Sequence, residues 1–160
     1  MTIRPATADD VPLLLPMVQR LADLHQAWDP RRYPYLPNIG ARYDRWLRMR
    51  AADPRGVFLV AEVTPGKLAG FCVATVEGEI PIYHTREIGF LHDLWVEEDY
   101  RHEGVGRQMV MLLIERFKQV GVKQIRLETA AANEAARGLF ASCGFRVSTI
   151  EMMMEMEFEV

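Results

Sequence analysis

A short glycine-containing segment carries the clearest chemical signal in the chain. Residues 101–106 read Arg-His-Glu-Gly-Val-Gly and stand between an apolar run typical of a β-strand and a long amphipathic pattern typical of a helix. The first turn of a helix has unpaired backbone N–H groups at the positive end of the helix dipole, and glycine keeps side-chain bulk away from them. Because such a turn attracts phosphate, the segment predicts a phosphorylated ligand.

Two common phosphate motifs do not match this segment. The dinucleotide fingerprint requires a third glycine where this chain has Met109, and the P-loop requires Lys-Ser/Thr where it has Arg107 and Gln108. The segment instead resembles the pyrophosphate loop of the GNAT superfamily of N-acetyltransferases, Arg/Gln-x-x-Gly-x-Gly/Ala. For this motif alone, a glycine-containing helix entry without a ligand is the alternative.

A second motif follows downstream, in the order that the GNAT superfamily requires. Residues 133–145 contain Asn133-x-x-Ala-x-x-Leu-Phe140-x-x-x-Gly-Phe145. This resembles the family signature Asn-x-x-Ala-x-x-Leu/Phe-Tyr-x-x-x-Gly-Phe, with phenylalanine in place of the tyrosine. Upstream, residues 90–96 (FLHDLWV) look like the fourth strand of polyamine- and aminoglycoside-type members. The resemblance is strongest over residues 57–145.

The resemblance implies acetyl-CoA as the cosubstrate and no metal. The amides from Arg101 to Arg107 would hold the pyrophosphate, and the edge of the fourth strand would pair with the pantetheine arm. Asn133 would contact the cofactor or serve only as a helix cap. The predicted cofactor contacts are Leu94, Trp95, Val96, Arg101, His102, Glu103, Gly104, Val105, Gly106, Arg107, Asn133 and Phe140.

His92 is the predicted catalytic base, and a histidine satisfied inside the sheet is the alternative. It aligns with a glutamate in polyamine-type members and with a histidine base in arylalkylamine-type members, and its ordinary pKa range suits the role. Strand alternation places His92 and Leu94 on one face and Asp93 on the other, where a structural hydrogen bond is expected. The family's acid, a tyrosine that protonates the leaving thiolate, is replaced by Phe140. We expect a rate loss within the ~10²–10⁴ range of one acid unless another group substitutes.

The predicted acceptor site lies around the loop that follows the first helix. Trp28, Asp29 and Tyr33 combine aromatic rings with a carboxylate, which suits an amine but also an ordinary loop anchor. The same region includes His25, Tyr35, Tyr83 and His84. The resemblance thus implies transfer of the acetyl group from acetyl-CoA to a primary amine of a small molecule, by direct attack in a ternary complex. The alternative is a CoA-binding sensor with weak or no turnover, which Phe140 favours.

Composition narrows the remaining possibilities. The 160 residues carry a net charge of −3, with 49% hydrophobic and 26% charged residues, as in globular proteins. We therefore expect one domain over residues 1–160, a cytoplasmic location, no nucleic-acid partner and no membrane partner. Cys72 and Cys143 show no metal spacing and are expected to be small buried hydrophobes.

Hydrophobic periodicity predicts a mixed α/β chain of the α+β type. The expected order is β-α-α-β-β-β-α-β-α-β-β, which resembles that of the GNAT fold. The resemblance implies a mostly antiparallel six- to seven-stranded sheet, helices on both faces and a cleft where strands 4 and 5 splay apart. Pro16 is expected to kink or restart the first helix. Residues 151–160 alternate methionine and other apolar residues with glutamate, which predicts a terminal strand that makes a homodimer plausible.

Overall fold

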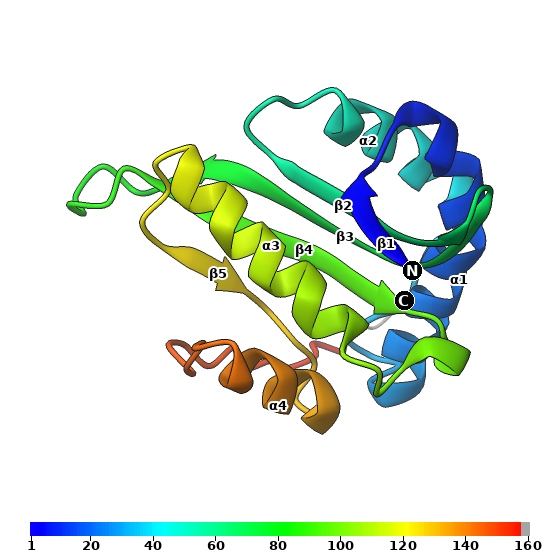
Figure 1. The fold of residues 1–160 in the computed structure, drawn as a ribbon. Helices are drawn as coiled ribbons and strands as arrows, with labels where there is room; N and C mark the ends of the chain where they lie inside the picture. The colour runs from blue at the N-terminus through cyan, green and yellow to red at the C-terminus, as the bar shows by residue number, and fades with distance from the viewer. Residues whose placement is uncertain (158–160) are drawn as a thin grey trace.

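The computed structural model describes residues 1–157, which contain a five-stranded sheet with the order β1-β2-β3-β4-β5 (Figure 1). Neighbouring strands are antiparallel except β4 and β5, which are parallel. The predicted mixed α+β class is confirmed, with fewer strands than the six or seven expected. The strands are β1 (Thr2–Pro5), β2 (Val57–Thr64), β3 (Lys67–Gly78), β4 (Glu87–Val96) and β5 (Ile125–Leu127).

Helices cover both faces of the sheet, as predicted (Figure 1). On one face α1 (Val11–Trp28) and α2 (Ile39–Ala51) pack side by side, and on the other lie α3 (Val105–Gln119) and α4 (Glu134–Ser142). Two short 3₁₀ turns, η1 (Ala8–Asp10) and η2 (Glu98–Tyr100), lead into α1 and toward α3. No helix in residues 1–157 combines the length and the apolar character needed to cross a bilayer.

Each face of the sheet has its own apolar core because apolar side chains recur at the helical period in α1 and α3. Leu14 and Val18 of α1 are buried against Phe71 of β3. Met109 and Phe117 of α3 are buried on the opposite face. Cys72, also on that face, is fully buried, and burial raises the pKa of its thiol to about 12. The expectation of a buried hydrophobe is therefore confirmed for this cysteine.

The first helix shows no restart at Pro16, one of the two outcomes expected there. Thr7 and Asp10 form the predicted capping box, with the Thr7 backbone N–H donating to the Asp10 carboxylate at 2.7 Å. However, α1 continues from Val11 to Trp28 without a restart at Pro16. The proline removes one hydrogen bond near the start of the helix, and the buried apolar face on both sides of it offsets that loss.

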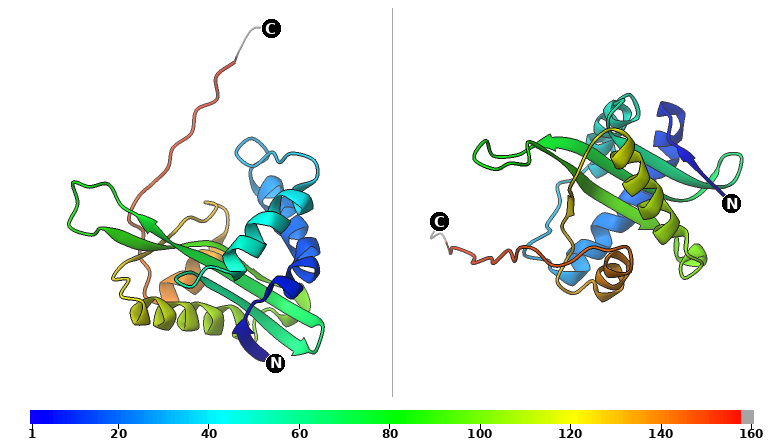
Figure 2. Two further views of the ribbon diagram at one scale, coloured as in Figure 1. Left: turned by 90° about the horizontal axis from the view of Figure 1, so that it is seen from above. Right: turned by 60° about the vertical axis from the view of Figure 1, so that its left-hand side comes forward.

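The predicted terminal strand is absent from the residues that the structure describes. The chain after α4 has no regular secondary structure, and its last part runs away from the body of the molecule (Figure 2). Met152 and Met154 are 91% and 79% exposed. Their alternation with glutamate fits a strand, but a strand forms only where its backbone and apolar face find partners. Phe158, Glu159 and Val160, the end of the predicted strand, lie outside the described residues.

The sheet opens between β4 and β5, as expected of the cleft. Their pairing covers only Gly89–Leu91 opposite Ile125–Leu127. Beyond Leu91, the last part of β4 pairs with β3 alone among the described strands. That edge lies next to the turn that leads into α3.

Candidate functional site

A β-bulge in β4 brings two titratable side chains together. Val73 of β3 pairs with Asp93 and the next residue, Ala74, pairs with Leu91, so His92 is the extra residue of the bulge. Both His92 and Asp93 line a cavity beside Tyr43 and Trp46 of α2. The prediction that strand alternation places His92 and Asp93 on opposite faces is therefore wrong.

The position of Leu94 also contradicts the prediction, which placed Leu94 on the same face as His92. It packs in the core on the α3 face of the sheet, whereas the ring of His92 lies edge-on to Trp46 of α2, with the ring centroids 5.3 Å apart. His92 and Leu94 therefore face opposite sides, because the bulge inserts one residue and reverses the pattern after it.

The His92 ring is held by polar groups on β3. Its Nε2 lies 2.7 Å from the hydroxyl oxygen of Thr75 and 3.2 Å from Oε1 of Glu77. The Thr75 hydroxyl donates to Glu77 at 3.1 Å, so its oxygen accepts from Nε2–H of His92. This network assigns the proton of the neutral imidazole to Nε2 and leaves the lone pair on Nδ1.

The surroundings of His92 favour its neutral form. Partial burial lowers the pKa of the imidazole below its ordinary value of 6.5, and the positive charge of Arg50 acts in the same direction. The Glu77 carboxylate opposes this by favouring the imidazolium. The net shift is downward, so at pH 7 His92 is mostly neutral and able to accept a proton.

Asp93 lies at the boundary of two cavities. It borders the cavity of His92 and Trp46 and also a second cavity between α1, α2 and the loop that joins them. The hydroxyl of Tyr43 donates to its two carboxylate oxygens at 3.3 and 3.5 Å. Burial raises the pKa of the Asp93 carboxyl to about 6, against the smaller opposing effects of Tyr43 and His25.

The glycine segment forms a sharp turn that leads into α3. His102 and Gly104 both have left-handed backbone conformations, with φ of 65° and 81°. Gly104 is the N-cap of α3, no side chain caps that helix, and a Cβ at Gly104 would meet no atom within 4 Å. The first amides of α3 therefore face an open position beside a residue without a side chain, which fits a phosphate group.

The remaining residues of this segment have mixed environments. Arg101, His102, Glu103 and Arg107 are exposed, whereas Val105 is buried in the core on the α3 face. The Arg101 Nε donates to the Val96 carbonyl at 2.8 Å, and its guanidinium lies over the Trp95 ring.

Gly106 has a role that the sequence did not suggest. A Cβ there would lie 3.3 Å from Leu139 of α4, so this glycine permits close contact between α3 and α4.

The strand edge predicted to bind pantetheine is the part of β4 beyond its pairing with β5. Val96 packs on the α3 face, and Trp95 is buried on the α1 face, where its indole N–H donates to Glu97 at 3.2 Å. Side chains thus anchor this segment from both faces while its outer edge extends past β5.

Two cofactor candidates lie on or next to α4. The Asn133 side chain accepts a hydrogen bond from the Ala136 amide at 3.1 Å, which is the capping role foreseen as its alternative. Phe140 is 8% exposed and packs edge-to-face against Phe145, with ring centroids 5.7 Å apart. Its ring is part of the core on the α3 face.

The three predicted acceptor residues separate in the structure. Tyr33 lines the cavity between α1 and α2 and lies edge-on to His25. Trp28 also lies edge-on to His25, with ring centroids 5.4 Å apart, and Asp29 accepts hydrogen bonds from the amides of Arg31 and Arg32. Trp28 and Asp29 are not among the residues that line either cavity. Tyr83 and His84, from the wider region, lie in the exposed β3–β4 connection.

Sequence reasoning missed the residues that support His92 and Asp93. Tyr43, Trp46, Thr75 and Glu77 received no role in the sequence analysis. Only the packing of α2 across the end of β4 and the pairing of β3 with β4 bring these side chains to the site. No local pattern in the sequence marked them.

Comparison with known proteins identifies the family of the chain. Residues 19–145 match the family model described as the acetyltransferase (GNAT) family. An uncharacterized N-acetyltransferase of Methanocaldococcus jannaschii is 31% identical over 145 residues, covering 90% of this chain and 60% of that protein. The [ribosomal protein bS18]-alanine N-acetyltransferase of Escherichia coli is 33% identical over 85 residues, covering 53% of this chain and 52% of that protein.

The fold has a near match among solved structures. A mutant of the BH1408 protein from Bacillus halodurans superposes with a TM-score of 0.83 at 21% identity, covering 98% of this chain and 100% of that one. This likeness concerns the fold alone. The chain spans between about half and 60% of the length of the curated relatives given above. With a family model that matches most of its length, the chain belongs to the GNAT family of acetyltransferases.

Proposed function

We propose that the protein is an N-acetyltransferase that moves the acetyl group of acetyl-CoA to a primary amine of a small molecule. The observation that carries the proposal is the bulge in β4. It places His92 and Asp93 in a cavity next to the strand edge that extends past β5. A base, a carboxylate and an accessible strand edge are what an amine acceptor and an extended thioester need side by side.

The chain offers two structural elements for the cosubstrate. The amides at the start of α3, beside Gly104, suit the pyrophosphate, and the edge formed by Leu94, Trp95 and Val96 suits the amide-bearing pantetheine arm. Acetyl-CoA, when bound, supplies an activated acetyl group on sulfur. The proposed contacts at Arg101, His102, Glu103, Val105, Gly106, Arg107, Asn133 and Phe140 extend this surface along the turn and α4.

His92 serves as the base in this proposal. Its Nδ1 lone pair accepts a proton from the acceptor's ammonium group, and the charge that develops on the ring is stabilised by Glu77, 3.2 Å from Nε2. Thr75, between the two, fixes the ring orientation. The freed amine nitrogen forms a bond to the acetyl carbon while the carbon–sulfur bond breaks. Of the two protons lost by the ammonium group, one ends on the thiolate and the other passes to solvent.

The proton on the leaving thiolate has a different source from that in typical family members. Phe140 has no proton to donate, and its ring is packed in the core. A thiolate with a pKa near 8.5 leaves acceptably at neutral pH, so water or the incoming amine suffices at a reduced rate.

A small acceptor fits the site better than a folded protein. The two cavities have volumes of about 380 and 460 Å³, in the range of small-molecule sites. The Escherichia coli relative is named for a protein acceptor, which is a property of that protein. A regulatory module that binds CoA without turnover is the second candidate, suggested by Phe140 and opposed by the His92–Thr75–Glu77 network.

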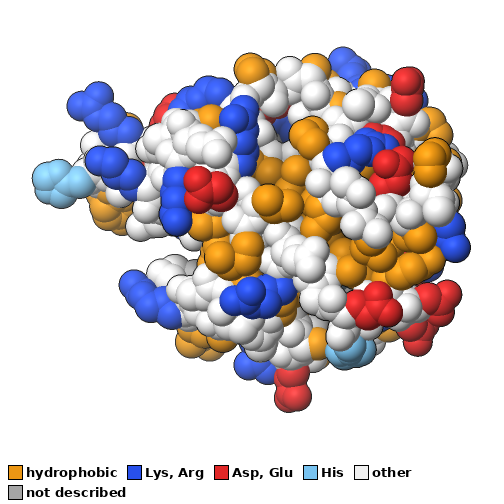
Figure 3. Space-filling model, viewed as in Figure 1, with side chains coloured by type: hydrophobic (Ala, Val, Ile, Leu, Met, Phe, Trp, Pro, Cys, Tyr) orange, Lys and Arg blue, Asp and Glu red, His pale blue; other side chains and the backbone are white. Residues whose placement is uncertain are grey.

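The proposed homodimer rests on exposed apolar surface. Met152 and Met154 of the C-terminal segment are exposed, and apolar side chains also gather across the middle of the α3 face, where Met111 and Leu112 are 42% and 46% exposed (Figure 3). Surfaces of this kind are often covered in an assembly.

Gly104→Glu tests the cofactor site, because it places bulk and negative charge where the pyrophosphate is proposed to lie. We expect its affinity for CoA, measured by calorimetric titration, to fall about 100-fold or more, with loss of thiol release from acetyl-CoA. Gly121→Glu is the matched control, since Gly121 follows the other end of α3, has a left-handed φ of 85° and has open space around its Cβ position. Equal CoA affinity in the two variants would contradict the proposal.

A further inference from the structure

Asp93 is a carboxylate without a cationic partner among the residues that the structure describes. Among residues 1–157, no lysine, arginine or histidine nitrogen is recorded within 4.0 Å of its oxygens, and the only side-chain donor is the neutral hydroxyl of Tyr43. Removing a carboxylate from water without such a partner is costly. That cost is tolerated mainly where the charge has a function.

The basic groups around Asp93 are already committed or lie at the cavity margins. His25 faces it from α1, and the Nδ1 of His25 is 2.8 Å from the Leu21 carbonyl. Arg32 borders one cavity and is paired with Glu151. Arg42 is an exposed residue at the border of the other. The position against the carboxylate is therefore open to a cation that arrives with a ligand.

The cavity that leads to Asp93 from α1 is mostly apolar and aromatic, with His25 and Arg32 as its basic side chains. Its walls come from both helices and from the loop between them, and Asp93 is its one carboxylate. Besides Asp93, His25 and Arg32, eight side chains line it: Val18, Leu21, Ala22, Pro34, Ile39, Tyr33, Tyr35 and Tyr43. A ligand with several ammonium groups would leave all but one of them facing apolar walls or the guanidinium of Arg32. A ligand with one ammonium group and an apolar body matches Asp93 and the apolar and aromatic part of the lining.

We propose that Asp93 anchors the ammonium group of the acceptor, and that the acceptor is a monoamine with an aromatic or aliphatic body that fills the cavity between α1 and α2. This inference rests on the proposed acetyl transfer and specifies its acceptor. The bulge makes Asp93 and His92 adjacent on the same face, so the group that holds the ammonium ion lies beside the group that removes its proton. Trp46 and Tyr43 line the same cavity, so their rings enclose the ammonium nitrogen of the acceptor between Asp93 and His92.

The test uses Asp93→Asn, which keeps the shape of the side chain and removes its charge. With 2-phenylethylamine as acceptor, we expect the KM for the amine to rise about 10- to 100-fold, with a much smaller change in kcat and an unchanged KM for acetyl-CoA. Asp23→Asn is the control, because Asp23 is an exposed carboxylate that accepts from Tyr35 at the same cavity without lining it. It should leave the KM for the amine within about twofold.

A binding measurement separates this inference from the proposed function. Calorimetric titration without acetyl-CoA should show that the wild-type protein prefers 2-phenylethylamine to the neutral 2-phenylethanol, and that Asp93→Asn loses this preference. Thiol release with an unchanged amine KM in Asp93→Asn, or with spermidine or kanamycin as the preferred acceptor, would overturn the inference alone. Ammonium preference without any thiol release would uphold the anchor and overturn the acetyl transfer. Thermal unfolding of each variant confirms that it is folded.

Discussion

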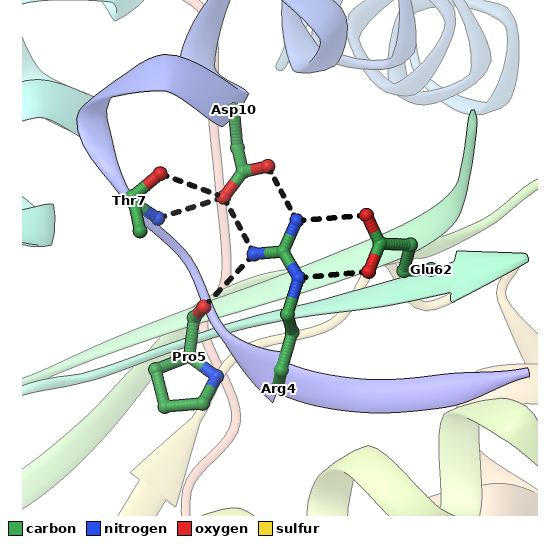
Figure 4. A network of polar contacts seen from close by, with 5 residues as sticks. All are labelled: Arg4, Pro5, Thr7, Asp10 and Glu62. Carbon is green, nitrogen blue, oxygen red and sulfur yellow. Dashed lines mark hydrogen bonds and ion pairs between the residues drawn. The ribbon is translucent and has the colours of Figure 1, made fainter. Parts of the chain in front are cut away.

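Two carboxylates removed from bulk water, Asp10 and Asp93, have opposite surroundings. Asp10 is 5% exposed and receives two hydrogen bonds from the Arg4 guanidinium, each of 2.8 Å, and another from the Thr7 amide (Figure 4). The same guanidinium binds Glu62 on β2. Among residues 1–157, Asp93 has only the Tyr43 hydroxyl as a side-chain donor, at longer distances.

The pKa values of the Asp10 and Asp93 carboxyl groups reflect this difference in surroundings. Hydrogen bonds from Arg4 hold the pKa of Asp10 below its ordinary value, whereas burial raises that of Asp93 to about 6. The charge of Asp10 stabilises the fold, because its ion pair with Arg4 links η1 to β1 and Arg4 also binds Glu62 of β2. The charge of Asp93 stabilises nothing within the described chain and is free to act on a ligand. Substitutions around Asp10 should therefore mainly change the free energy of unfolding, whereas substitutions around Asp93 should mainly change activity and ligand binding.

The largest effect is expected at His92, in the region of Asp93. His92→Gln keeps a polar group near Thr75 but removes the base, so kcat/KM should fall by ~10²–10⁴ while the unfolding temperature changes little. Because burial lowers the pKa of His92 below 6.5, wild-type kcat at saturating amine should be constant above neutral pH and fall below that pKa. The variant should lack this decline in kcat, which a pH–rate profile measures, whereas the acidic decline in kcat/KM caused by protonation of Asp93 should remain. If the pH–rate profile for kcat of the variant were the same as that of the wild type, the role of His92 would be structural.

The next largest effect is expected at Arg4, in the other region. Arg4→Met leaves the carboxylates of Asp10 and Glu62 without their cation, and should lower the free energy of unfolding by about 2–4 kcal/mol without changing kcat of the folded protein. Since the pKa of Asp10 is lowered in the folded state, this stabilisation is present above its unfolded value of 3.8 and is lost as pH falls below it. Denaturant unfolding at pH 7 and pH 3 measures both effects.

Arg48→Met provides the comparison for Arg4. Arg48 pairs with Asp44 on the exposed face of α2, at 3.0 Å with i,i+4 spacing. Such an exposed pair contributes little to stability because solvent screens it. If the two substitutions cost the same, the Arg4 network is no more than a surface ion pair.

Local patterns explain how much of the fold could be predicted. The apolar period of α1 and α3 and the β-branched runs of β2 and β3 depend on near neighbours, and the structure has these elements in the predicted order. The C-terminal alternation of methionine and glutamate predicted a strand wrongly within residues 151–157, because pairing depends on a distant partner that the pattern does not specify.

The site could be predicted only in part for the same reason. The turn at Gly104 is specified by glycine spacing, and the structure has the left-handed turn before α3 that the motif requires. The bulge at His92 leaves no mark in the sequence FLHDLWV, which reads equally well as a regular strand. The positions of Tyr43 and Trp46 beside it follow from helix packing, which no local pattern determines.

A smaller effect than that of Arg4→Met, and one of opposite sign, is expected from Asp93→Asn on stability. The pKa of Asp93 is raised from 3.8 to about 6 on folding, so ionisation costs the folded state stability as pH rises from about 4 to about 6. Removing the charge should therefore increase the free energy of unfolding at pH 7.5 by about 1–2 kcal/mol, after allowance for solvent in the cavities. At pH 4 the gain should disappear, because Asp93 is then protonated in the folded wild-type protein. Denaturant unfolding at the two pH values measures the difference.

This stability gain and the loss of amine binding by the same variant belong together. A carboxylate that destabilises the empty protein and holds a cationic ligand is a residue retained for binding, because folding alone would favour asparagine there. If Asp93→Asn instead lowered stability at pH 7.5 as Arg4→Met does, Asp93 would have a partner in the fold. The contrast between the two carboxylates would then fail, and with it the reason to assign Asp93 to the acceptor.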